Sequence, residues 1–191
     1  ILVLVVLSLF FSGKVYAACS KASGDISGTS SGSPHTTAYS CADNNTFVLD
    51  ADEYMSGSAA RITATADNIT INNSGNLLAT GAGNVITSGA YDTVTLNNQS
   101  TGVIKGTTNG IFLGAGDAWE IDNYGDIYGV SAKAVNIRGG DNTQITNRSG
   151  AKIRTDGLNA VLMQNSSGSN ASETLTLDNY VTISSKANTV K

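Results

Sequence analysis

The chain has little charge, one histidine and two cysteines, and these shortages exclude several function classes before any motif is considered. Charged residues make up 14% of the 191 residues, the net charge is −4, and lysine and arginine are scattered. We therefore expect no basic patch that contacts nucleic-acid phosphates, and no nucleic-acid partner. The only histidine, His35, lies far in sequence from any candidate nucleophile and base, which argues against a histidine-dependent triad. A metal site would have to recruit His35 without any CxxC spacing, and is the weaker interpretation of the cysteines.

The chain also lacks an apolar run long enough to cross a membrane. Residues 1–11 are almost all apolar, but such a run is too short for a transmembrane helix. It is followed by Val15-Tyr16-Ala17, which places small residues at the two positions that a signal peptidase reads. We expect residues 1–17 to be a partial signal peptide that is cleaved between Ala17 and Ala18. Because no initiator methionine or basic segment precedes Ile1, we expect the chain to begin inside this signal.

The two cysteines, Cys19 and Cys41, both come shortly after the signal segment. In an exported chain such a pair predicts a disulfide, which would close a loop of about 22 residues and stabilise the fold by about 3 kcal/mol. The segment 18–60 shows none of the repeats described below and contains the only proline, Pro34. We expect it to form an N-terminal cap, held by the disulfide, over the open end of the fold. A lipoprotein signal through Cys19 is the alternative, although Tyr16 stands where such a signal prefers leucine.

What the sequence does contain is a repeat of about 25 residues. Two β-type residues at alternate positions are followed five times by an asparagine-containing turn, and the asparagines are 25, 25, 24 and 32 residues apart. These ladder positions are Asn73, Asn98, Asn123, Asn147 and Asn179. The residues four and two positions before each asparagine are large and apolar in nine cases of ten, with Thr143 as the exception. Each pair marks a short strand with one buried face, and the constant period indicates one unit stacked on itself.

Two further series share this period. One consists of triplets whose third member should face inward: Asn84-Val85-Ile86, Asn109-Gly110-Ile111, Lys133-Ala134-Val135, Asn159-Ala160-Val161 and Asn188-Thr189-Val190. The other consists of shorter apolar pieces: Leu77-Leu78, Val103-Ile104, Ile127, Ile153 and Val181/Ile183. Three short strands and three turns per repeat predict an all-β parallel β-helix over residues 61–191. We expect the asparagines to stack, to hydrogen-bond along the axis and to tolerate left-handed backbone angles; surface turns that simply favour asparagine are the alternative.

One repeat is longer than the others. The distance from the triplet series to the next ladder asparagine is 14 residues three times and 20 residues once, so six extra residues fall in the polar run 164–172. This run predicts a protruding loop. Its candidate binding residues are Gln164, Asn165, Ser166, Ser167, Ser169 and Asn170. The run offers neither an aromatic anchor nor a charge, which favours an ordinary surface loop.

The repeat units resemble those of a known family. Ile121-Asp122-Asn123-Tyr124-Gly125-Asp126-Ile127 and the unit from Ile145 to Ile153 are similar to the "ITNSGTI" repeats of bacterial autotransporter passenger domains. The resemblance covers residues 61–191 and implies a right-handed parallel β-helix on the cell surface or outside the cell. It further implies export through a signal peptide and a C-terminal outer-membrane β-barrel. That barrel does not occur in these residues, so we expect an N-terminal fragment of a longer protein or a truncated gene.

No catalytic constellation is evident. The Gly-Asp-Ser-Gly and Gly-Asp-Ser-Leu elements of protease and lipase passengers do not occur. Asp122, Asp126 and Asp141 come nearest to a glycan-cleaving set, but their repeat positions need not converge, and solvated turn residues are the simpler interpretation. Trp119 occupies an inward slot and is expected in the core. We therefore assign no catalytic residue, metal ligand or cofactor.

We expect an adhesin or a self-associating structural stalk whose partners are host or bacterial surface molecules, including further copies of itself. The alternative is a polysaccharide lyase or hydrolase whose catalytic coils lie downstream of Lys191.

Overall fold

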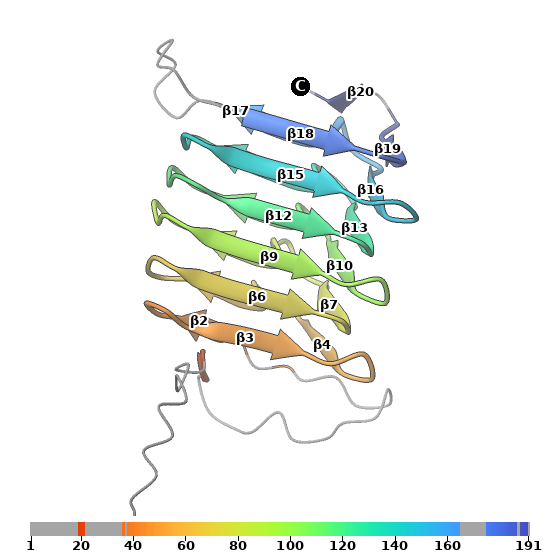
Figure 1. The fold of residues 1–191 in the computed structure, drawn as a ribbon. Coiled ribbons are helices and arrows are strands. Elements are labelled where there is room, and N and C mark those ends of the chain that lie inside the picture. The colour runs from red at the N-terminus through yellow and green to blue at the C-terminus, as the bar shows by residue number, and fades with distance from the viewer. Residues whose placement is uncertain (1–18, 22–35, 37, 165–174, 187, 191) are drawn as a thin grey trace, which may run out of the picture.

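The fold is a solenoid of parallel β-strands, as the repeat predicts. The structure is a computed structural model, and it describes residues 19–21, 36, 38–164, 175–186 and 188–190. Within these residues all regular secondary structure is β-strand, and the strands stack coil upon coil (Figure 1). Strands of the near sheet in Figure 1 run from left to right as the chain climbs, so the superhelix is right-handed.

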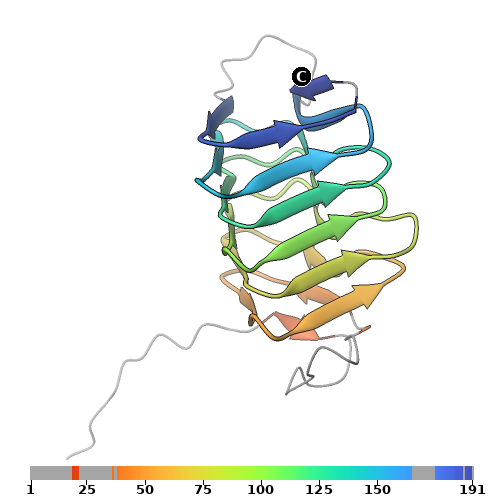
Figure 2. The same ribbon diagram turned by 90° about the vertical axis from the view of Figure 1, so that its right-hand side faces the viewer.

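Each coil contributes one strand to each of three sheets, and Figure 2 shows the same stack from an adjacent side. The β3–β18 sheet contains β3 (Thr46–Leu49), β6 (Ile69–Asn73), β9 (Val94–Asn98), β12 (Glu120–Asn123), β15 (Thr143–Asn147) and β18 (Leu175–Asn179). The β4–β19 sheet contains β4 (Tyr54–Gly57), β7 (Asn76–Ala79), β10 (Val103–Gly106), β13 (Asp126–Gly129), β16 (Lys152–Thr155) and β19 (Thr182–Ser184). The β1–β20 sheet contains β1 (Ser20–Lys21), β2 (Tyr39–Cys41), β5 (Ile62–Ala64), β8 (Ile86–Ser88), β11 (Ile111–Leu113), β14 (Val135–Arg138), β17 (Asn159–Gln164) and β20 (Asn188–Val190).

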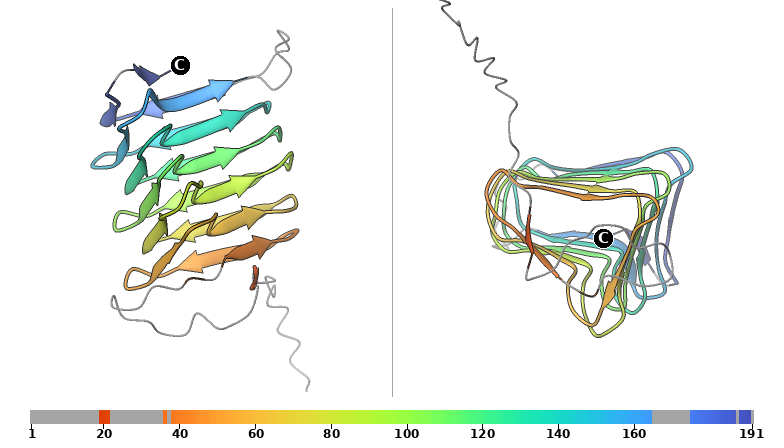
Figure 3. Two further views of the ribbon diagram at one scale, coloured as in Figure 1. Left: turned by 180° about the vertical axis from the view of Figure 1, so that it is seen from behind. Right: turned by 90° about the horizontal axis from the view of Figure 1, so that it is seen from below.

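Strand register places the same repeat position of successive coils side by side. Ile86, Ile111, Val135 and Val161 are consecutive partners in the β1–β20 sheet, as the triplet series predicts, and all four side chains are buried. Viewed along the axis, the three sheets enclose a central space that these inward side chains fill (Figure 3). Each fully buried aliphatic side chain contributes about 1.5–3 kcal/mol. The core is therefore one continuous column along the axis.

The coils begin earlier than the boundary at residue 61 that the sequence predicts. Strands β2, β3 and β4 pair in parallel and in register with β5, β6 and β7 of the next coil. Their inward residues, such as Phe47 and Met55, join the same core. The repeat was identified by its asparagines, and this coil has none at the ladder position: Leu49 stands there and pairs with Asn73 of the next coil.

The N-terminal end is closed by a short antiparallel strand and a disulfide. Strand β1 pairs with β2 through Ser20 with Ser40 and Lys21 with Tyr39. The predicted disulfide between Cys19 and Cys41 is present and fastens this strand to the first coil. The expected signal peptide and its cleavage site between Ala17 and Ala18 lie outside the described residues.

Candidate functional site

The ladder asparagines lie inside the solenoid. The Nδ2 group of each asparagine donates to the Oδ1 atom of the next, over 2.8 Å from Asn73 to Asn98, 2.7 Å from Asn98 to Asn123, 2.8 Å from Asn123 to Asn147 and 2.9 Å from Asn147 to Asn179. The first four side chains are fully buried. Because a buried amide without partners is costly, this chain of hydrogen bonds is what allows polar groups at the core boundary. The ladder is therefore structural and offers no surface for a ligand.

The ladder has a direction, and its first acceptor has no donor. The Oδ1 atom of Asn73 is buried and has no hydrogen-bond partner, since the preceding coil presents Leu49 at the ladder position. At the other end the step from Asn147 to Asn179 spans 32 residues, yet the amide bond is kept. The insertion therefore leaves the register intact. Of the candidate loop residues only Gln164, an exposed residue at the end of β17, is described; Asn165, Ser166, Ser167, Ser169 and Asn170 lie outside the described residues.

Left-handed backbone angles occur elsewhere than at the ladder asparagines. Among the described non-glycine residues, positive φ angles of 54–58° are found at Asn44, Asn68, Thr93, Ala118 and Asn142. Each lies five residues before a ladder position, in the turn that leads into a strand of the β3–β18 sheet. The prediction that the ladder asparagines use these angles was therefore wrong: they end β-strands, and the preceding turn requires the unusual conformation.

A column of aspartates precedes these turns, and sequence reasoning missed it. The backbone N–H groups of Asp67, Asp92, Asp117 and Asp141 each donate to Oδ1 of the aspartate one coil earlier, over 2.8–3.0 Å, beginning at Asp43. The spacings of 24, 25, 25 and 24 residues follow the asparagine period and could have revealed it. These carboxylates satisfy the exposed turn N–H groups. Asp141 therefore belongs to this column, away from Asp122 and Asp126.

Two clusters of tyrosine, arginine and aspartate lie on the outside of the wall, one on either side of the turn between β12 and β13. In the first, Arg148 pairs with both carboxylate oxygens of Asp122, at 2.6 and 3.1 Å. Its guanidinium lies 5.6 Å from the centre of the Tyr124 ring. Tyr124 is 42% exposed, and the next coil but one presents a second exposed tyrosine, Tyr180, directly after its ladder asparagine.

The second cluster surrounds Tyr128. Arg154 pairs with both carboxylate oxygens of Asp126 and lies 4.3 Å from the Tyr128 ring centre, and Lys105 lies 5.5 Å from the same centre. The Tyr128 hydroxyl donates to Asp156 over 2.7 Å, and Lys186 contacts the same carboxylate at 3.3 Å. The hydrogen bond to Asp156 is the largest cause that raises the pKa of Tyr128 and lowers the pKa of Asp156. Cations and a hydroxyl contact thus hold this ring in place.

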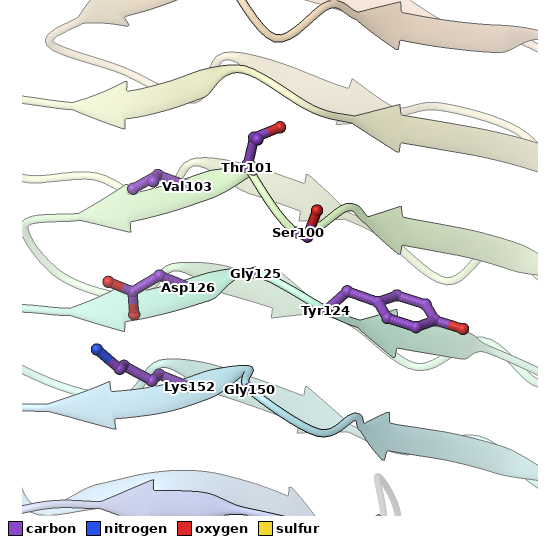
Figure 4. Close-up of a pocket in the computed structure, with 9 residues that line it drawn as sticks. Ser100, Thr101, Val103, Tyr124, Gly125, Asp126, Gly150 and Lys152 are labelled. Atoms are coloured by element: carbon purple, nitrogen blue, oxygen red, sulfur yellow. The ribbon is translucent and has the colours of Figure 1, made fainter.

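A shallow groove of about 170 Å³ lies between the two clusters. Its base is formed by glycines: a Cβ atom on Gly102 or Gly125 would meet backbone oxygens at 2.5 Å or less, whereas Gly150 has nothing within 4 Å. Close coil stacking therefore excludes side chains at Gly102 and Gly125, and the surface is hollow there. In Figure 4 Val103, Asp126 and Lys152 form one column, on the opposite side of the Gly125 and Gly150 backbone from Tyr124. Ser100 and Thr101 complete the groove lining.

Other sequence expectations concern single residues and segments. Trp119 is fully buried, as predicted, and its Nε1 group donates to the Tyr91 carbonyl over 2.6 Å. Thr143, the one polar residue of the inward pairs, is also buried, and its hydroxyl has no hydrogen-bond partner. Within the described residues no cluster of three potential metal ligands is found, nor a helix that could span a membrane.

Comparisons with protein-family models, curated proteins and solved structures find no match.

Proposed function

We propose that this chain is the solenoid segment of an exported bacterial surface protein and acts by binding, as an adhesin or by self-association. The observation that carries the proposal is the contrast between the two sides of the wall. Inward positions hold aliphatic side chains and the amide ladder, which stabilise the coils. Outward positions near the β12–β13 turn hold the exposed Tyr124 and two arginines beside a groove, and tyrosine and arginine are enriched where proteins bind partners.

Two further observations support export and surface display. The Cys19–Cys41 disulfide suits an oxidising compartment outside the cytoplasm. The repeat units are similar to those of autotransporter passengers, in which a C-terminal barrel anchors the solenoid in the outer membrane. That similarity is an analogy between sequences, so the autotransporter assignment belongs to the proposal.

The shape of the solenoid explains how weak contacts would suffice. Each coil advances about 4.8 Å along the axis, so a stack of coils holds its surface away from the membrane and repeats its outer positions at a constant spacing. A long ligand, or a second cell surface, can then make many contacts at once, and avidity replaces a single deep pocket.

The competing proposal, a polysaccharide-cleaving enzyme, gains no support from the described coils. General acid–base cleavage of a glycan needs a carboxyl pair that is free to exchange protons with the substrate. Both oxygens of Asp122 contact Arg148, and both oxygens of Asp126 contact Arg154. Asp122 and Asp126 are therefore not such a pair.

The test is to produce the protein from its complete reading frame on a bacterial surface. We expect increased cell aggregation or attachment relative to cells without the gene. If display changes neither property while the protein depolymerises an acidic glycan, the binding proposal is wrong and the enzyme proposal takes its place.

A further inference from the structure

The outer faces of two sheets carry charge of opposite sign. On the β4–β19 sheet the outward charged strand residues are Lys105, Lys152, Arg154 and Asp126, which leave a net charge of +2, and Asp156 directly follows β16. On the β3–β18 sheet the outward charged strand residues are Glu120, Asp122 and Asp178, and Arg148, which directly follows β15, pairs with Asp122. A basic face raises the local concentration of anions, whereas the rest of a chain whose net charge is −4 repels them.

Lys152 is a cation of this face that is free to bind. Its side chain is exposed and lines the groove. Its register partner on the neighbouring strand is Asp126, but both oxygens of that carboxylate contact Arg154. Within the part of the chain that the structure describes, no ion pair joins Lys152 to a carboxylate. An anion that enters the groove would therefore find a lysine that makes no ion pair among the described residues, beside the Asp126 carboxylate that Arg154 already contacts.

Tyr124 supplies an apolar surface at the opposite edge of the groove from this charge. The Arg148 guanidinium lies 5.6 Å from the ring centre, and the residue remains 42% exposed. The face of an aromatic ring is electron-rich and attracts polarised C–H groups, such as those on the flat face of a pyranose ring. The exposed Ser100 hydroxyl and the groove backbone add hydrogen-bonding groups.

The geometry points to a binding site for an acidic polysaccharide, one that carries carboxylate or sulfate groups, along the groove and the basic face. A sugar ring packs against Tyr124, and the acidic group of another sugar of the same polysaccharide contacts Lys152 on the other side of the Gly125 and Gly150 backbone. Two coils away along the axis Lys105 lies about 10 Å farther on, and it contacts a later acidic group of the same chain. This inference rests on the proposed binding function and names its ligand class.

A second copy of the chain is the other occupant that charge permits, because the acidic β3–β18 face of one molecule could contact the basic face of another. The glycan is favoured because the groove is a depression lined by residues of three successive coils, and a chain of sugars fits such a depression better than a flat sheet face does.

The experiment measures binding of the full chain to polygalacturonate, dextran sulfate and neutral dextran by calorimetry at low and moderate salt. We expect binding to at least one of the two acidic polymers and none to dextran. Lys152→Ala and Tyr124→Ala should each weaken binding about tenfold. Tyr124→Phe should keep the affinity, because it retains the ring.

Matched controls distinguish a site from general attraction. Lys133→Ala removes the same charge from the turn before β14, at another corner, and should change affinity less than twofold. Tyr180→Ala removes an exposed ring that does not line the groove, and it should also have little effect. Equal weakening by Lys133→Ala and Lys152→Ala would show nonspecific charge attraction and overturn the site.

Sedimentation velocity without polysaccharide tests the second occupant. If the chain oligomerises at low salt and Lys152→Ala makes it monomeric, the basic face serves self-association and the glycan inference is wrong.

Display on cells distinguishes failure of the groove inference from failure of the adhesin proposal. If displayed cells attach equally well with Lys152→Ala, the groove inference fails while the adhesin proposal stands. If wild-type display has no effect on attachment or aggregation, the adhesin proposal fails even though the purified chain binds polysaccharide.

Discussion

Replacing Asn98 with alanine tests whether the buried amide ladder stabilises the solenoid. The side chain accepts from Asn73 over 2.8 Å and donates to Asn123 over 2.7 Å and to the Gly102 carbonyl over 3.2 Å. Its neighbour on the same strand, Asn97, is the matched control because it faces outward and makes one side-chain bond, to Asn72 over 2.9 Å. The two variants remove the same atoms from adjacent residues.

The expected cost follows from which groups lose their partners. Asn73 donates its amide to no other described group, so Asn98→Ala leaves a buried donor unsatisfied, at about 1–3 kcal/mol. The Asn123 oxygen still accepts from the Gly125 N–H, so its loss is smaller, about 0.5–1.5 kcal/mol. We expect Asn98→Ala to cost about 3 kcal/mol in total and Asn97→Ala about 0.5 kcal/mol.

Urea unfolding followed by the fluorescence of Trp119, the only tryptophan and a buried one, measures the difference. With a slope of about 2 kcal/mol per molar urea, Asn98→Ala should lower the midpoint by about 1.5 M and Asn97→Ala by about 0.3 M. Equal midpoints for the two variants would refute the claim that the interior ladder stabilises the coils.

The variant Asn98→Asp separates hydrogen bonding from packing. It keeps the side-chain shape and can accept from Asn73, but at neutral pH it places a carboxylate oxygen against the Asn123 oxygen. The ionised form is thus disfavoured in the folded state, so the folded pKa lies above the unfolded value of about 3.9. Relative to Asn98→Ala, its stability should rise as pH falls through the folded pKa, because the neutral acid can donate to Asn123. If the stability of Asn98→Asp relative to Asn98→Ala does not change with pH, packing of the side chain and not its hydrogen bonds determines the difference.

Three smaller changes test other parts of the structure. Thr93→Asn should stabilise the fold by about 0.5–1 kcal/mol, because a β-branched residue with φ of 58° is strained, and Asn68→Thr should destabilise it by a similar amount. Thermal unfolding in which Thr93→Asn lowers the midpoint, or Asn68→Thr raises it, would contradict this. Thr143→Val should stabilise by about 1 kcal/mol in urea unfolding by removing a buried hydroxyl without a partner, and destabilisation would indicate an unrecognised partner. Tyr128→Phe should raise the pKa of Asp156 in an NMR titration, because the Tyr128 hydroxyl is the largest cause that lowers it; an unchanged pKa would show that Lys186 dominates.

The candidate site was less accessible to sequence reasoning than the fold. Asp122 and Asp126 were recognised as carboxylates without a role, but their arginine partners lie 26 and 28 residues later in the chain and touch them only once the coils stack. The groove depends on glycines whose tight contacts are with other coils. The aspartate column, by contrast, follows a period that the sequence displays and could have been predicted.

The sequence by itself determined the architecture, because a period of about 25 residues with alternating apolar positions permits one way of burying them: three short strands per coil, stacked in parallel. It likewise determined the inward positions and the Cys19–Cys41 disulfide. Only the tertiary structure decided where the coils begin, because the first coil has Leu49 in place of the asparagine that marks the repeat in the sequence. The tertiary structure also decided which turn adopts left-handed angles and which face is basic. These features depend on which neighbour each residue meets one coil away, and a side chain's own sequence context does not contain that information.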